Sequence, residues 1–144
     1  MNLRRILSID GGGIKGMFPL AFLAAVEDVV GGQIGRFFDL IVGSSTGGII
    51  ALGLGLGYSA NDLLAFYETL GATVSGVTLL ARVRGAPFVS QYDARCLQRA
   101  LQEKFGTRRL GHSSMRLVIP ALDLERGRVH VFKTAHHPRF ERDY

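Results

Sequence analysis

The chain has 144 residues, of which 47% are hydrophobic and 20% charged, and its formal net charge is +5. This length supports one hydrophobic core, so we expect a single domain over residues 1–144, and the composition excludes a disordered chain. The single cysteine excludes an internal disulfide and a cysteine-based zinc site.

The chain shows no membrane-spanning or secretory segment. No apolar run approaches the roughly 18 residues of a membrane span, and the basic opening leads into only four residues before Asp10. We therefore expect a cytoplasmic protein, whose positive charge would suit peripheral contact with an anionic membrane. The arginine pairs are scattered and have no interleaved aromatic residues, so we expect no nucleic-acid partner.

An apolar run breaks into Gly43-Ser44-Ser45-Thr46-Gly47 and then resumes as a second apolar run. The pattern predicts a strand over residues 37–42, a tight turn, and a helix that begins at about Thr46. A serine between two glycines at such a turn is typical of a nucleophile elbow, with the Ser45 hydroxyl exposed at its apex. The alternative is an ordinary glycine-rich turn, because Gly-x-Ser-x-Gly occurs often by chance in a chain with 19 glycines.

Earlier in the chain, a short apolar run over residues 4–10 predicts a buried strand that stops at a glycine loop, residues 11–16. Residues 17–30 are almost wholly apolar and are followed by two glycines, which predicts a helix. Strand, loop, helix, strand and elbow together form a βαβα unit. We therefore expect a parallel sheet with a right-handed connection.

The later segments are less regular. We expect the helix after the elbow to end among Gly53, Gly55 and Gly57, and an amphipathic helix over residues 60–70, with Ser59 and Asp62 forming a capping box. Residues 71–92 have no clean period and predict a long connection, either packed irregularly or acting as a lid over an apolar substrate. A helix follows residue 93 and closes at residue 106, and two runs at 117–124 and 128–133 predict a hairpin.

The glycine loop allows more than one interpretation. Residues 11–16 match Gly-x-Gly-x-x-Gly between a strand and a helix, as in dinucleotide-binding folds, but the second strand ends in glycine and serine rather than in the required acid. A P-loop is excluded because Lys15 precedes its glycine. In the third interpretation, the loop and the elbow share the carboxyl edge of the sheet, and the Gly12 and Gly13 amides face an oxyanion formed by attack of Ser45.

The two motifs together resemble the patatin-like phospholipases, whose signature is Asp-Gly-Gly-Gly-x-Lys/Arg-Gly followed by Gly-x-Ser-x-Gly. Residues 10–16 and 43–47 match it in order, and residues 90–93, 104–106 and 119–123 are also similar to that family. The resemblance implies a three-layer α/β/α fold with a mainly parallel sheet. It also implies hydrolysis of phospholipid or related lipid esters by a Ser–Asp dyad, with no metal or organic cofactor.

The resemblance assigns site residues one by one. Ser45 carries over as nucleophile, and the elbow around it comprises Gly43, Ser44, Thr46 and Gly47. The oxyanion loop comprises Gly11, Gly12, Gly13, Ile14, Lys15 and Gly16. The catalytic aspartate of the family, in a later Asp-Gly-Gly or Asp-Gly-Ala, has no counterpart here, so we expect a C-terminally truncated domain that is weak or inactive by itself. Some relatives are switched on by nucleotide signals.

Two alternatives stay open. Ser45, Asp123 and either His136 or His137 occur in the order of an α/β-hydrolase triad, although the elbow follows the second strand, which is early for that fold. In a different functional class, the chain is a non-catalytic lipid- or partner-binding module that keeps the fold without the base.

Overall fold

The computed structural model describes residues 3–83, 94–135 and 139, with backbone alone for 72–83 and 94. Internal packing divides the chain into two compact units. The first comprises Met1–Leu64 and Arg109–Tyr144, and the second comprises Ala65–Arg108. The two sequence motifs both fall in the first unit.

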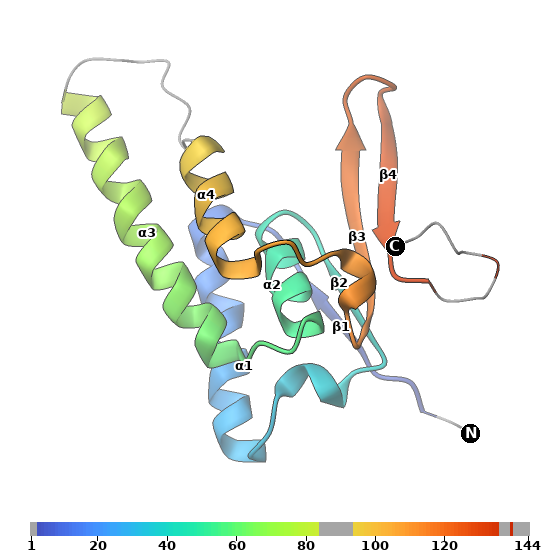
Figure 1. Cartoon of the computed structure of the whole chain (residues 1–144). Helices are drawn as coiled ribbons and strands as arrows, with labels where there is room; N and C mark the ends of the chain where they lie inside the picture. Colours follow the sequence, from blue (N-terminus) through green and yellow to red (C-terminus); the bar gives the residue numbers. More distant parts are fainter. Residues whose placement is uncertain (1–2, 84–93, 136–138, 140–144) are drawn as a thin grey trace. The chain divides into compact units, whose positions relative to one another are not determined.

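The first unit is built on a four-stranded sheet with the order β1-β2-β3-β4 (Figure 1). The strands are β1 (Ile6–Ile9), β2 (Leu40–Gly43), β3 (Arg116–Asp123) and β4 (Arg128–Lys133). β1, β2 and β3 are parallel, and β4 returns antiparallel to β3, so the predicted parallel unit and hairpin are confirmed. The second strand begins later than predicted, because Ile34–Phe37 forms a short 3-10 helix, η2.

Two helices complete the first unit. α1 (Met17–Val30) has the bounds that the sequence predicts, and it ends where Gly31 adopts φ 68° and donates its N–H to the Glu27 carbonyl at 2.9 Å. α2 (Thr46–Gly55) follows the elbow and packs on β1, β2 and β3. The core between α2 and the sheet consists of residues from both that are almost wholly buried: Ile9, Ile41, Ile50, Leu54 and Leu117. The α/β class and the mainly parallel sheet are confirmed.

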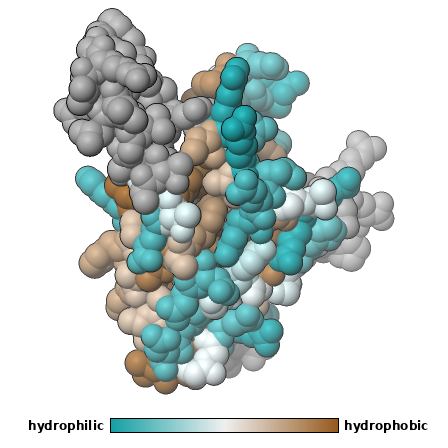
Figure 2. Space-filling model, turned by 60° about the vertical axis from the view of Figure 1, so that its left-hand side comes forward, coloured by the Kyte–Doolittle hydropathy of each residue, from teal (hydrophilic) through white to brown (hydrophobic). Residues whose placement is uncertain are grey.

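The strand residues that alternate with this core point to the opposite face of the sheet. Several of them are apolar and exposed: Ile6 is 60% exposed, Leu122 63% and Val129 67%. The register pairs Leu122 with Val129 on neighbouring strands, so they form one surface. Apolar side chains also reach solvent on the face of the molecule drawn in Figure 2, where brown marks hydrophobic residues.

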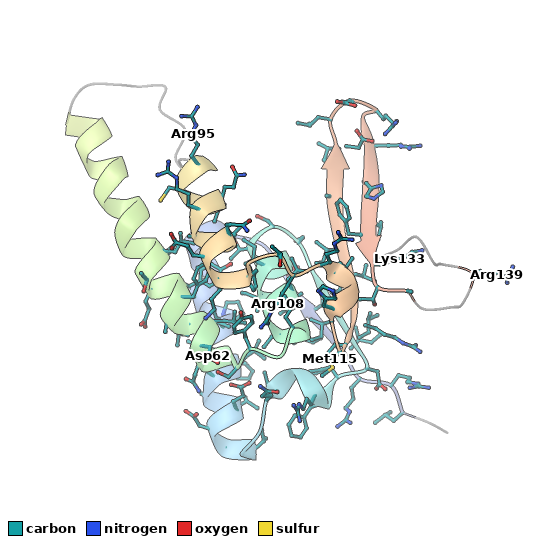
Figure 3. The ribbon with its side chains drawn as sticks, in the orientation of Figure 1. Asp62, Arg95, Arg108, Met115, Lys133 and Arg139 are labelled. Carbon is teal, nitrogen blue, oxygen red and sulfur yellow. The ribbon has the colours of Figure 1, made fainter. Side chains whose placement is uncertain are left out.

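α3 (Ala60–Val83) begins in the first unit and continues into the second. The predicted capping box is present: the Asp62 N–H donates to Ser59 Oγ at 2.9 Å, and the Ser59 N–H donates to Asp62 Oδ2 at 3.2 Å (Asp62 is labelled in Figure 3). The prediction of a loop from residue 71 is wrong up to Val83, where the backbone is helical. Gly71 and Gly76 lower helix propensity by only about 1 kcal/mol each, which does not end a helix already nucleated. The rest of that predicted connection, residues 84–92, lies outside the described residues.

The second unit also contains α4 (Ala94–Phe105), which ends at Gly106 with φ 60° as predicted. The Gly106 N–H donates to the Gln102 carbonyl at 2.8 Å. The rings of Phe66 on α3 and Phe105 on α4 meet edge to face, with centroids 6.4 Å apart. Within the described ranges, no helix combines the length and the hydropathy needed to cross a membrane.

Candidate active site

Ser45 occupies the turn between β2 and α2. Its backbone angles are φ 52° and ψ −122°, and it is the one non-glycine residue with positive φ in the described part of the chain. Such a conformation costs on the order of 1–3 kcal/mol, so the surrounding structure must hold it in place. The residue is exposed, and it directly precedes the first turn of α2. Its hydroxyl is therefore presented to solvent beside the positive end of a helix dipole.

The glycines on either side of Ser45 are required sterically. A Cβ on Gly43 would overlap the carbonyl of Gly47, and a Cβ on Gly47 would overlap the carbonyl of Ile9. β2 therefore approaches α2 so closely at Gly43 that only hydrogen fits. Gly47 sits equally close to the end of β1. This is the physical reason for the Gly-x-Ser-x-Gly spacing that the sequence analysis singled out.

The glycine loop lies directly against the elbow. β1 and β2 are parallel and end in register, with Ile9 opposite Gly43, so the chain leaves both strands at the same edge. A Cβ on Gly11 would lie 2.7 Å from Ser45 Cβ, and a Cβ on Gly16 would overlap the side chain of Thr46. The two ends of the loop are thus both packed on elbow residues, as the sequence predicts for motifs that share a sheet edge.

The glycine loop contains backbone amides that make no hydrogen bond within the described residues. Gly13–Gly16 forms the 3-10 helix η1, Gly13 has φ 58°, and the Lys15 N–H donates to the Gly12 carbonyl at 3.2 Å. Among the described residues, the N–H groups of Gly12 and Gly13 have no hydrogen-bond acceptor. Ile14 and Lys15 are exposed. Unused amides beside an exposed hydroxyl can stabilise an oxyanion chemically.

Acidic residues near the sheet do not fit the dinucleotide interpretation. Asp39 precedes β2, at the opposite end of the strand from the glycine loop. Its Oδ2 accepts the Arg5 N–H at 2.9 Å, and its Oδ1 lies 3.0 Å from Arg4 Nη1. The Arg5 N–H and the Arg4 side chain hold the pKa of Asp39 below its usual value. The carboxyl end of β2, where a ribose-binding acid would stand, leads into Ser44 and Ser45 instead.

Of the residues of the alternative triad, the structure describes Ser45 and Asp123. Asp123, at the end of β3, is bound to the hairpin arginines: its Oδ2 lies 3.2 Å from Arg126 Nη1 and 4.0 Å from Arg128 Nε. An acid held by two cations is poorly suited to orient a histidine. His136 and His137 lie outside the described residues. Within the described ranges, no group of three His, Cys, Asp or Glu residues is arranged to hold a metal ion.

The structure adds one contact that the sequence analysis missed. The Gly11 N–H donates to Ser44 Oγ at 3.3 Å, which links the glycine loop to the elbow through a side chain. The two residues are 33 positions apart, and no spacing rule relates them. The parallel pairing of the two strands was the only available signal.

Comparison with known proteins gives consistent matches. A family model described as patatin-like phospholipase matches residues 7–143. A cGAMP-activated phospholipase of Pseudomonas aeruginosa is 37% identical over 140 residues, which cover 96% of this chain and 42% of that protein. A cGAMP-activated phospholipase of Escherichia coli is 34% identical over 151 residues, which again cover 96% of this chain and 42% of that protein. Patatin-like protein 2 of Oryza sativa subsp. indica is 31% identical over 137 residues, which cover 83% of this chain and 34% of that protein.

The chain thus spans about two fifths of the length of the bacterial relatives it matches. The names of those relatives describe activation by cGAMP, a nucleotide ligand. The expectation of no nucleic-acid partner therefore gains no support from them.

Proposed function

Because the chain belongs to the patatin-like phospholipase family, we propose that it supplies the nucleophile and the oxyanion hole of a lipid acyl hydrolase. The observation that carries the proposal is the conformation of Ser45, an exposed serine held at positive φ against a glycine loop with two unused amides. Strain of this kind persists where the surrounding fold enforces it, and it is concentrated at functional sites. The substrate class is the carboxylic ester of a phospholipid or a related lipid.

In the proposed reaction, Ser45 Oγ attacks the ester carbonyl carbon while a base accepts the hydroxyl proton. The carbonyl oxygen becomes an oxyanion, which the Gly12 and Gly13 N–H groups stabilise together with the amino end of α2. Collapse of this intermediate releases the alcohol, with its proton returned by the base, and leaves an acyl-serine ester. Water activated by the same base then hydrolyses that ester and frees Ser45.

The base in this proposal is the aspartate of the family's Asp-Gly-Gly or Asp-Gly-Ala element. The only Asp-Gly in these 144 residues is Asp10-Gly11, which opens the glycine loop. The catalytic aspartate would therefore come from a longer protein that contains this chain. The family carries out its chemistry without a metal or an organic cofactor, and we propose the same here.

A lipid substrate and a net charge of +5 support peripheral contact with an anionic membrane from the cytoplasm. Co-sedimentation with vesicles tests this part of the proposal. Binding should increase with the fraction of phosphatidylserine and decrease as salt is raised. Equal binding to neutral and anionic vesicles would contradict it.

The test of the catalytic proposal is substitution in the longer protein. Ser45→Ala removes the nucleophile and should lower kcat for a short-chain ester by about 10⁴-fold or more, whereas Ser44→Ala should leave substantial turnover. Both variants and the wild type are assayed with and without cGAMP, so that a requirement for an activator is not mistaken for inactivity. Turnover that survives in Ser45→Ala and is lost in Ser44→Ala would overturn the assignment. A wild-type protein that binds lipid but hydrolyses no ester under either condition would favour the non-catalytic module.

A further inference from the structure

The strand pairing between β1 and β2 is extended beyond the strands by Ser44. The paired residues end with Ile9 opposite Gly43. Past that point, the Ser44 N–H donates to the Ile9 carbonyl at 3.3 Å, and the Gly11 N–H donates to Ser44 Oγ, also at 3.3 Å. In a regular parallel ladder the second bond would go to a backbone carbonyl. Here a side-chain hydroxyl takes that place, because the backbone of Ser44 is already entering the elbow.

This bond holds the glycine loop in close contact with the elbow. A Cβ on Gly11 would lie 2.8 Å from the Ser44 carbonyl oxygen and 2.7 Å from Ser45 Cβ. Gly11 directly precedes Gly12 and Gly13, and Ser44 directly precedes Ser45. One hydrogen bond therefore ties the residue before the amide donors to the residue before the nucleophile.

We infer that Ser44 is a positioning residue, whose hydroxyl sets the Gly12 and Gly13 amides at the distance from Ser45 that oxyanion stabilisation requires. The inference rests on the proposed function. Donors must lie roughly 2.7–3.1 Å from the developing oxyanion, so a small displacement of the loop weakens transition-state binding and leaves substrate binding nearly unchanged. Serine or threonine can fill this role, because each carries a hydroxyl at this position, whereas alanine cannot.

The experiment compares Ser44→Ala, Ser44→Thr and Ser114→Ala in the longer protein. Ser114 is the control, because its Oγ likewise bonds one backbone group away from the glycine loop: it donates to the Gly55 carbonyl at 3.2 Å, whereas Ser44 Oγ accepts. Loss of one neutral hydrogen bond corresponds to about 3- to 10-fold in rate. Ser44→Ala should lower kcat by about that factor with KM within about 2-fold, whereas Ser44→Thr should restore kcat and Ser114→Ala should not change it.

A second readout isolates the oxyanion. A thionoester places sulfur, a larger and weaker acceptor, where the oxygen would be, so an enzyme with well-placed amides prefers the oxygen ester. Ser44→Ala should reduce that preference, because displaced amides slow hydrolysis of the oxygen ester more than hydrolysis of the thionoester. An unchanged preference with active wild type would overturn the positioning role and leave the proposed function intact. If the wild type hydrolyses neither ester with or without cGAMP, the proposed function fails and the positioning role fails with it.

Discussion

At the scale of single residues, close packing around two glycines determines the shape of the elbow, and the sequence contains both of them. Gly43 and Gly47 have no room for a Cβ, and Ser45 takes a backbone conformation that side chains disfavour. The turn around Ser45 could be predicted from five residues, although the close approach of Gly47 to the Ile9 carbonyl joins distant parts of the chain. The link from Ser44 to Gly11 could not, because it depends on how two strands align.

The backbone strain at Ser45 leads to a stability prediction. Ser45→Gly should be more stable than Ser45→Ala by about 1 kcal/mol, because glycine adopts positive φ without steric cost and alanine does not, and only part of this gain is lost to the entropy of the unfolded chain. Urea unfolding of the two variants measures the difference, and neither should hydrolyse ester. Equal stability, or a more stable alanine variant, would mean that the elbow does not hold Ser45 at φ 52°.

At the scale of elements, a buried carboxylate joins segments that are distant in sequence. Glu27 on α1 is 6% exposed, and its two oxygens accept the Ile34 N–H at 2.8 Å and the Ala60 N–H at 2.7 Å. It therefore fixes the start of η2 and the first turn of α3 against α1. The sequence predicted α1 with its correct bounds, yet gave no reason to assign this acid to two backbone amides.

Glu27→Gln should lower the free energy of unfolding by about 1–3 kcal/mol. The amide group of glutamine is a donor, so one of the two buried N–H groups would lose its acceptor. Asp28→Asn is the matched control, because Asp28 is the exposed neighbour of Glu27 and its Oδ1 accepts from Asn61 Nδ2 at 3.1 Å. Chemical denaturation should show little change for it. A control that loses as much stability as Glu27→Gln would contradict this account of the buried carboxylate.

The length of α3 shows where reasoning from pattern alone fails. Its start was predicted because the Ser59–Asp62 capping box is a local signal, and its end was misplaced because residues 71–92, which begin with Gly71, show no clean period. Hydrogen bonds along a formed helix outweigh the small cost of one glycine. The cap therefore predicted where α3 begins, whereas the loss of apolar periodicity did not mark where it ends.

At the scale of the whole molecule, the sheet has one face packed under α2 and another on which Ile6, Leu122 and Val129 stay exposed. An exposed apolar face of this kind marks a surface that normally meets another part of a protein or a partner. The bacterial relatives are more than twice as long as the segment they share with this chain. Both observations agree with the absence here of the family's Asp-Gly-Gly or Asp-Gly-Ala element.

Residues 1–144 by themselves should hydrolyse a short-chain ester far more slowly than a longer protein that contains them. A serine hydroxyl is a poor nucleophile without a positioned base, whereas the glycine loop alone can still provide a small acceleration. The measurement is kcat/KM for both proteins at equal concentration, with circular dichroism to show that the shorter one is folded. Comparable kcat/KM values would contradict the claim that the base lies outside these residues. They would favour Asp123 with His136 or His137 as the base.

The most direct test of the central claim is to locate the nucleophile chemically. A fluorophosphonate probe reacts with activated serines, and peptide mapping by mass spectrometry then identifies the modified residue in the longer protein. The account predicts a single adduct on Ser45, formed much faster than in residues 1–144 alone and blocked by a competing lipid ester. An adduct on Ser44 or on a serine outside the elbow, with Ser45 unmodified while ester turnover is lost, would contradict it.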